Sequence, residues 1–227
     1  MEPLLTAEQF EALRRLDACA VANAVETFDV RQRNEGFTNS SIRCIFDHHP
    51  PMLGYAATGR IRSAAAPTVS SLPVVRGFGF ADRTDWWSYV LTVPAPRVVV
   101  LEDMDHSPGL GAFMGEVHAT ICQALGCMGY VTNGSVRDLN AVESLGFHFF
   151  AGHVSVSHSY VHIVEFGEPV EVGGLQVRPG DLIHGDCHGV QSLPRSIAAQ
   201  IPAASARLGQ KERTIMELCR APGFLLE

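Results

Sequence analysis

A cation and a carboxylate stand side by side after a short apolar segment of the sequence. Residues 129–132 are expected to form a strand that runs into an Asn133–Gly134 turn, and Arg137 and Asp138 follow. The planar guanidinium of Arg137 suits a two-point contact with a substrate carboxylate. The Asp138 carboxylate is a hard oxygen ligand for a divalent cation. The pair is therefore suited to hold a 2-oxo acid together with a metal that polarises its carbonyl.

The surroundings of this pair decide how it is interpreted, because adjacent opposite charges at a turn are most often a solvated surface pair. Glu116 lies twenty-one positions before Arg137, and the glycine-rich segment 109–115 lies between an expected strand and an expected helix. A helix N-terminus binds anions through its free N–H groups. Nucleotide binding is disfavoured, because the strand after the glycines ends at Asn133 rather than at an acidic residue that could hold a ribose.

The composition is that of an ordinary globular protein. The chain has 227 residues, of which 46% are hydrophobic and 18% charged, and its net charge is −7. An acidic chain without a dense basic patch is not expected to bind nucleic acid. The N-terminus does not resemble a signal peptide, no apolar run is long enough to span a membrane, and the six cysteines are scattered. We therefore expect a cytoplasmic protein with reduced, buried thiols and no membrane contact.

Two forms of covalent catalysis are disfavoured. Lys211 is the only lysine and lies in polar surroundings, whereas a Schiff-base lysine needs an apolar pocket. In the run Asp186-Cys187-His188 a thiol stands next to a base, but neighbouring side chains on an extended strand point to opposite faces. Carbon–carbon bond cleavage by this chain would therefore depend on a metal to stabilise an enolate.

Hydrophobic periodicity predicts a single α/β domain over residues 1–227, with a β-rich second half. Thr6 is the expected N-cap of a helix over about 7–27. A second long helix is expected over about 195–219, with Pro202 as an interruption. The shorter predicted elements are helices at 116–126 and 138–145, strands at 97–103 and 147–151, a hairpin at 170–177, strand or turn segments at 54–65 and 73–80, and a loop at 47–51 within the polar segment 31–53.

Histidines in the second half offer a rival metal site. His158, His162, Glu165 and His184 loosely follow the metal-binding strands of a cupin barrel. Tyr160 stands where the second histidine of a His-x-His pair would be. Satisfied or surface histidines are the more ordinary interpretation of this pattern.

An ordered set of motifs runs through most of the chain: Thr58-Gly59-Arg60, Gly115-Glu116, Gly134–Asp138, Leu145-Gly146-Phe147, Val177–Leu182, and Gly185-Asp186 with Gly189-Val190. In this order they resemble the family named after the regulator of ribonuclease activity A. That family also contains metal-dependent 4-hydroxy-4-methyl-2-oxoglutarate aldolases and oxaloacetate decarboxylases. Asn133 and His188 stand where the family more often has acidic residues, and Val117–His118 replaces a pair of leucines.

The resemblance implies an RraA-like α/β/β/α sandwich of the swivelling-domain type, assembled as a homotrimer or homohexamer with active sites between subunits. It implies that Arg137 binds the carboxylate and keto oxygens of the substrate and that Asp138 ligates Mg²⁺ or Mn²⁺. Glu116 would lie beside metal-bound water, and Glu212 on the C-terminal helix would reach across the interface. The backbone N–H groups that would bind the carboxylate are those of Gly115, Glu116, Val117 and His118.

We therefore expect a metal-dependent lyase that cleaves or decarboxylates small 2-oxo dicarboxylic acids through a pyruvate enolate. His118 is expected to act as a general acid or to select a polar substrate tail, unless it is a helix-surface residue. The alternatives are a non-catalytic regulator that binds a ribonuclease or another protein partner and, less favoured, a cupin-like histidine metalloprotein.

Overall fold

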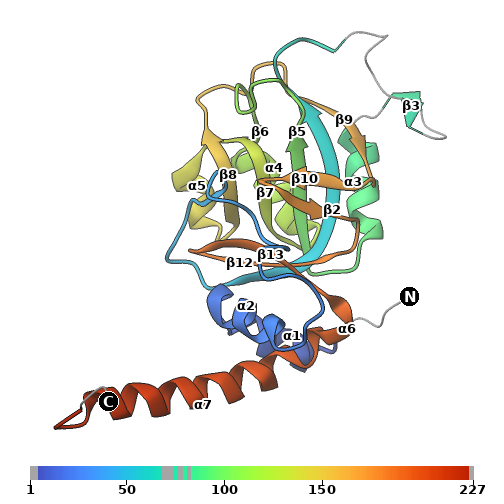
Figure 1. The fold of residues 1–227 in the computed structure, drawn as a ribbon. Helices are drawn as coiled ribbons and strands as arrows, with labels where there is room; N and C mark the ends of the chain where they lie inside the picture. Colours follow the sequence, from blue (N-terminus) through green and yellow to red (C-terminus); the bar gives the residue numbers. More distant parts are fainter. Residues whose placement is uncertain (1–4, 68–73, 76–78, 81–82, 225–227) are drawn as a thin grey trace.

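The computed structural model describes residues 5–67, 74–75, 79–80 and 83–224. Within these residues nine strands form one curved sheet, in the order β1-β8-β7-β5-β2-β12-β13, with β6 paired to β7 and β9 paired to β2 (Figure 1). The bounds of the strands are β1 Arg43–Cys44, β2 Met52–Arg62, β5 Arg97–Asp103, β6 Ala112–Met114, β7 Cys127–Val136, β8 His148–Val154, β9 His162–Phe166, β12 Leu182–Asp186 and β13 Gly189–Leu193.

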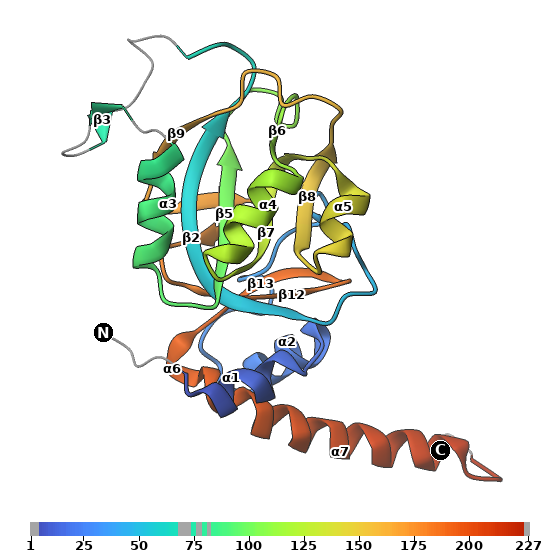
Figure 2. The ribbon, with the colours of Figure 1, turned by 180° about the vertical axis from the view of Figure 1, so that it is seen from behind.

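The middle of the sheet is parallel, since β2, β5, β7 and β8 run in the same direction. Helices α3 (Arg83–Thr92), α4 (Glu116–Ala124) and α5 (Leu139–Ser144) join these strands and cover one face of the sheet (Figure 2). The predicted buried strand at 97–103 is confirmed as β5. The alternation of strands and helices confirms the predicted α/β class. The carboxyl ends of β5 and β7 meet at one edge of the sheet, where α4 and α5 begin.

A hairpin packs on the other face of the sheet. It is formed by β10 (Val170–Val172) and β11 (Leu175–Val177), which confirms the hairpin predicted at 170–177. Gly173 and Gly174 have φ angles of +57° and +80°, the backbone conformation that a two-residue turn between strands requires. The apolar side chains of the hairpin are buried in a second core together with β5 and β7, whereas Glu171 and Gln176 are exposed.

The helix predicted over 7–27 is in fact two helices, α1 (Ala7–Arg14) and α2 (Ala18–Glu26). Thr6 caps α1, as predicted, and forms a capping box with Gln9. The division has a local cause, because the Asp17 side chain accepts a hydrogen bond from the backbone of Ala20 and so begins a new helix.

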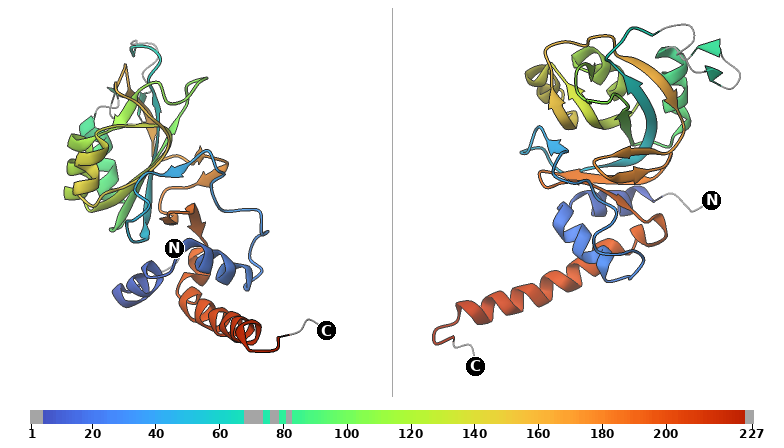
Figure 3. Two further views of the ribbon diagram at one scale, coloured as in Figure 1. Left: turned by 90° about the vertical axis from the view of Figure 1, so that its left-hand side faces the viewer. Right: turned by 45° about the horizontal axis from the view of Figure 1, so that its top comes forward.

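The helix predicted over 195–219 is also two helices, α6 (Arg195–Ala198) and α7 (Ile201–Arg220). Pro202 lies in the first turn of α7, where its missing N–H costs nothing, so it begins the helix rather than interrupting it. The first turns of α7 pack on α1 and α2, and the rest of the helix projects from the body (Figures 1 and 3). Neither α7 nor any other described helix is long and apolar enough to cross a membrane.

The loop predicted at 47–51 is confirmed, because it lies between β1 and the start of β2 at Met52. Other small predictions need correction. The expected Asn133–Gly134 turn lies inside β7. In the expected segment 73–80, residues 74–75 (β3) and 79–80 (β4) pair with each other, and residues 73 and 76–78 lie outside the described part of the chain. The assignment of residues 1–227 to one domain stays a prediction.

The cysteines are less buried than the sequence predicts. Cys122 and Cys127 are buried and Cys44 is half-buried, whereas Cys19, Cys187 and Cys219 are exposed. The two buried thiols lie at the end of α4 and the start of β7, between the helix layer and the sheet. The expectation that the cysteines are buried residues of the core therefore holds for Cys122 and Cys127 but not for the three exposed cysteines.

His148 is a buried histidine in the strand next to β7. Its ring lies edge-on to His49, with the ring centroids 5.2 Å apart, and nearly parallel to Phe150. The side chain is 5% exposed, and burial lowers the pKa of His148 to about 4, with a further contribution from the neighbouring His49. The folded protein therefore holds this ring neutral.

We predict that His148 makes stability fall in mild acid. The unfolded chain protonates this residue below about pH 6.5, whereas the folded chain does so only near pH 4, so the stability contribution is lost as the pH falls through this window. Between pH 7 and pH 5 the wild type should lose about 2 kcal/mol more unfolding free energy than His148→Gln. Urea titrations at both pH values measure this difference. The exposed His106→Gln serves as the control, and equal pH dependence in wild type and His148→Gln would refute the prediction.

Candidate active site

Arg137 and Asp138 lie between the end of β7 and the first turn of α5. The backbone N–H of Arg137 donates to the carbonyl of Met114 at 3.2 Å. Asp138 has a left-handed backbone with φ +55°, a conformation that costs non-glycine residues about 1–3 kcal/mol. Its carboxylate oxygen Oδ2 accepts hydrogen bonds from the N–H of Glu116 at 3.1 Å and from Nε of Arg137 at 3.3 Å. One carboxylate therefore joins the starts of α4 and α5 and orients the guanidinium.

Gly115 is required by the position of this carboxylate. A Cβ atom at Gly115 would collide with Oδ2 of Asp138 and would come within 3.0 Å of Cγ of Arg137. The φ angle of Gly115 is −142°, an extended conformation that any residue can adopt. The glycine is therefore needed for space, not for its backbone conformation.

The N-terminus of α4 forms one wall of the site. The resemblance implied that four backbone N–H groups of residues 115–118 bind the substrate, but that of Glu116 already donates to Asp138. The geometry of a helix start leaves the N–H of Val117, the second residue of α4, without an acceptor inside the helix. The Glu116 side chain is exposed and lines a shallow hollow beside Asp138 and the first turn of α5. Asp138 also lines the larger pocket that Arg137 and His118 form, so it lies between the hollow and that pocket.

The imidazole of His118 is fixed in position. It stacks on Phe113 with the ring centroids 4.9 Å and the planes 8° apart, and its Nδ1 lies 2.7 Å from the Phe113 carbonyl oxygen. Because a carbonyl oxygen can only accept, Nδ1 carries the proton and Nε2 is the basic nitrogen of the neutral ring. His118 is therefore a positioned group that lines the pocket, not an unrestrained residue of the helix surface.

A pocket of about 290 Å³ brings most of the predicted residues together. Its lining comprises Ala112, Phe113, Gly115, Val117, His118, Arg137, Asp138, His158 and Val161. The sequence did not indicate Phe113 or Val161, and it assigned His158 to a different site. His158 enters the pocket because the segment around it binds the start of β6, where the N–H of Ala112 donates to the Ser157 carbonyl at 3.0 Å. This contact joins residues 45 positions apart in the sequence, so no local sequence pattern could predict that His158 lines the pocket.

The histidines of the cupin alternative do not form a site among the described residues. His162 bonds the nearby Tyr160 carbonyl, and Glu165 pairs with Arg60. His184 is buried, with Nε2 3.0 Å from the carbonyl oxygen of Leu16. Within the described ranges, the one group of three such side chains close enough to hold a metal ion is Asp186, Cys187 and His188.

Glu212 lies away from the pocket within one chain. It is an exposed residue of α7, the helix that packs on α1 and α2 and then projects from the body (Figure 3). A contribution of Glu212 to the site would have to come from a neighbouring subunit, as the resemblance implied, and it stays a prediction.

Asn133 holds the strand edge next to the site. Its side chain accepts a hydrogen bond from the N–H of Asp103 at 2.7 Å and donates one to the carbonyl of Asp103 at 3.0 Å. This amide acts as an additional rung between β5 and β7 after their backbone pairing ends at Leu101 and Thr132. Only a side chain with both a donor and an acceptor can do this, which explains why an amide suits this position better than a carboxylate.

The comparisons with known proteins agree with this architecture. The chain matches the RraA-like family, described as Aldolase/RraA, over residues 18–191. It therefore belongs to the RraA-like family, and the resemblance predicted from its motifs is confirmed.

Individual relatives are more distant. A protein of Halalkalibacterium halodurans, provisionally named as a 4-hydroxy-4-methyl-2-oxoglutarate aldolase, is 34% identical over 85 residues, which are 37% of this chain and 40% of the relative. The match thus spans less than half of that relative. An uncharacterized protein from Pseudomonas syringae has a TM-score of 0.72 at 18% identity, covering 98% of this chain and 93% of its own. Streptomyces coelicolor RraAS2, titled an unusual member of the RNase ES inhibitor RraA family, has a TM-score of 0.70 at 19% identity, covering 94% and 98%. These structural likenesses show the fold.

We predict that Asn133→Asp weakens the sheet edge. The carboxylate cannot donate to the Asp103 carbonyl, and it adds a second acidic group beside Asp103, whose pKa is already raised by burial. The loss of unfolding free energy should be about 1–3 kcal/mol. The exposed Asn140→Asp on α5 is the matched control and should change stability little. Wild-type stability of Asn133→Asp in urea titrations at pH 7 would contradict the proposed role of the amide.

Proposed function

We propose that this protein is a divalent-metal-dependent lyase that cleaves or decarboxylates small 2-oxo dicarboxylic acids through a pyruvate enolate. The observation that carries the proposal is the arrangement of Arg137 beside Asp138, next to the start of α4, in a pocket that His118 also lines. A cation, a hard oxygen ligand and a helix N-terminus are the groups that an anionic substrate and an enolate need. The RraA-like family membership and the provisional aldolase name of one partial relative support it.

The residues present fit a hard cation such as Mg²⁺ or Mn²⁺. The hydrogen bonds that the Asp138 carboxylate makes with described residues use Oδ2, so Oδ1 remains to face a cation. Its side chain is 38% exposed, which leaves room for water, and magnesium in proteins commonly keeps several waters and only one or two carboxylates. When bound, the cation would act as a Lewis acid on the 2-oxo group.

Each surrounding residue has a role in this proposal. Arg137 binds the carboxylate and keto oxygens of the substrate, and the N–H groups of Val117 and His118 receive the same anionic end. Glu116 and, from a neighbouring subunit of a homotrimer or homohexamer, Glu212 orient the water that carries protons. His118, with Nδ1 held by Phe113, presents a fixed ring that protonates the product or selects the substrate tail.

The position of Lys211 supports metal over imine chemistry. This single lysine is exposed on α7, away from the pocket, and so lacks the apolar surroundings that lower the pKa of a Schiff-base lysine. Stabilisation of an enolate by this chain therefore depends on Arg137 and a bound cation.

The alternative function is non-catalytic regulation of a ribonuclease or another protein partner. It is supported by the likeness to Streptomyces coelicolor RraAS2, a member of the RNase ES inhibitor RraA family, and by exposed apolar side chains on the projecting part of α7, among them Ile215 and Leu218. Complex formation that needs no metal, together with no turnover of 2-oxo acids, would favour this alternative.

We predict that Arg137→Ala and Asp138→Ala each abolish pyruvate release. Oxaloacetate and 4-hydroxy-4-methyl-2-oxoglutarate are tested as substrates with Mg²⁺ or Mn²⁺ and with EDTA. Loss of one strong electrostatic contact should lower the rate by roughly 10²–10³-fold or more. Circular dichroism should show both variants folded, and the exposed Arg178→Ala should keep full activity. Full activity in either site variant, or release that persists in EDTA, would overturn the lyase assignment.

We also predict that Gly115→Ala weakens Mn²⁺ binding. The added methyl group occupies the space of Oδ2 of Asp138, so the carboxylate must move away from α4. Mn²⁺ titration followed by water-proton relaxation should show roughly tenfold or greater loss of affinity. Gly209→Ala on α7, where a Cβ meets its nearest neighbour at an ordinary 3.4 Å, is the control. Unchanged Mn²⁺ affinity in Gly115→Ala would remove Asp138 as the ligand.

A further inference from the structure

The turn between β12 and β13 brings a thiol, an imidazole and a carboxylate together. The sequence predicted that Cys187 and His188 point to opposite faces of a strand, but β12 ends at Asp186 and β13 begins at Gly189, so both lie in the turn. Sγ of Cys187 is 3.4 Å from Nδ1 of His188, and Nδ1 is 3.0 Å from Oδ1 of Asp186. One ligand atom from each of the three residues lies within 4.8 Å of the other two.

These spacings are close to those of a tetrahedral metal site. With bonds of the usual length to zinc, a nitrogen and a sulfur ligand are about 3.6 Å apart and a nitrogen and an oxygen ligand about 3.4 Å apart. The observed separations differ from these values by a few tenths of an ångström. The Sγ of Cys187 and the Asp186 carboxylate lie within 4.8 Å of each other, so rotation of the exposed Cys187 side chain would have to bring this third pair to the spacing of ligands.

Asp186 is held in place from its other side. The residue is 6% exposed, and Oδ2 accepts a hydrogen bond from the N–H of Ala18, in the first turn of α2, at 2.7 Å. Oδ1 accepts a hydrogen bond from the backbone N–H of His188 at 2.9 Å and lies 3.0 Å from Nδ1 of the same residue. A carboxylate whose two oxygens are both bonded to the backbone is oriented in advance, as metal ligands usually are.

The local electrostatics favour a cation. The buried Asp186 carboxylate belongs to the cluster, and a second carboxylate residue, Asp17, directly precedes Ala18, whose N–H binds Asp186. These negative charges attract a divalent cation, which would in turn stabilise the Cys187 thiolate.

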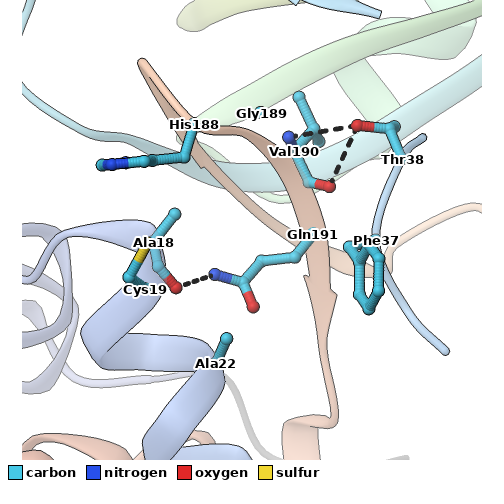
Figure 4. A pocket seen from close by; sticks show the side chains of 9 residues that line it. All are labelled: Ala18, Cys19, Ala22, Phe37, Thr38, His188, Gly189, Val190 and Gln191. Carbon is cyan, nitrogen blue, oxygen red and sulfur yellow. Dashed lines mark hydrogen bonds between the residues drawn. The ribbon is translucent and has the colours of Figure 1, made fainter. Parts of the chain in front are cut away.

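A pocket of about 240 Å³ opens beside the cluster and gives the ion access to solvent. His188 and Cys19 both line it, together with Phe37 and Val190. In Figure 4 the His188 ring and the Cys19 sulfur lie on the same side of Gln191, away from Phe37. Gln191 and Ala18 also line this pocket, and the Gln191 side chain donates a hydrogen bond to the Ala18 carbonyl at 2.8 Å. The pocket shares no lining residue with the Arg137 pocket.

We propose that Asp186, Cys187 and His188 form a second metal site, which binds a borderline divalent cation of the zinc type through Oδ1, Sγ and Nδ1. Thiolate and imidazole ligands select such an ion over Mg²⁺, which prefers oxygen. Binding exchanges the thiol proton for the metal and releases it to solvent, with the His188 proton on Nε2. The site is separate from the proposed lyase centre and does not depend on it.

The test is titration of the full-length, reduced and chelator-treated protein with Zn²⁺ and Co²⁺. We expect one high-affinity site and, with Co²⁺, the absorption band of a thiolate-to-metal charge transfer. Cys187→Ser should remove the band, and His188→Ala should weaken Zn²⁺ binding roughly tenfold or more. Both residues are exposed, so the variants should fold. Asp186 is left unchanged because its carboxylate anchors α2.

Two matched controls make the result decisive. Cys219→Ser removes an exposed thiol on α7 and should keep the band, and Asp138→Asn alters the proposed lyase centre and should keep Zn²⁺ affinity. Millimolar Mg²⁺ should not compete. Absence of a thiolate band in the wild type, retention of the band in Cys187→Ser, or loss of Zn²⁺ affinity in Asp138→Asn would each overturn the proposal.

Discussion

The candidate site depends on one hydrogen-bonded carboxylate. Oδ2 of Asp138 binds the first N–H of α4 and the Nε of Arg137, and it takes the space that any side chain at position 115 would fill. The left-handed backbone of Asp138 directs the carboxylate to this place. A charged acceptor at a helix N-terminus is favoured by the helix dipole as well as by the hydrogen bond. The start of α4, the start of α5 and the guanidinium therefore form one unit.

The rest of the fold brings the parts of that unit to one edge of the sheet. Parallel strands joined by helices place the carboxyl ends of β5 and β7 side by side, as in other α/β proteins that bind ligands at this edge. The β10–β11 hairpin buries the apolar side chains on the face of the curved sheet that the helices α3, α4 and α5 do not cover. The β12–β13 turn lies on the antiparallel part of the sheet, next to α2, so a second cluster can form there without any contact with the first.

Sequence reasoning succeeded where a local pattern carries the information. Strand β5 is a run of buried β-branched residues, the Gly173–Gly174 hairpin has its turn residues, and Arg137-Asp138 with Gly115 belongs to an ordered motif. It failed where a contact distant in sequence decides. His158 reaches the pocket through the bond between Ser157 and the start of β6, and Asn133–Gly134, a strong turn signal, lies inside β7, where Asn133 bonds to Asp103. Cys187 and His188 were misjudged because β12 ends one residue earlier than an extended strand would require.

The extended state of Asn133–Gly134 also affects how the protein ages. In a flexible chain an asparagine before glycine is prone to cyclise, when the glycine nitrogen attacks the side-chain carbonyl and ammonia leaves. Here the Asn133 amide is held by two hydrogen bonds, and the N–H of Gly134 donates to the Thr132 hydroxyl at 2.9 Å. Attack requires both sets of bonds to open together. The rate of deamidation at position 133 therefore reports how often the β5–β7 edge that supports the site opens.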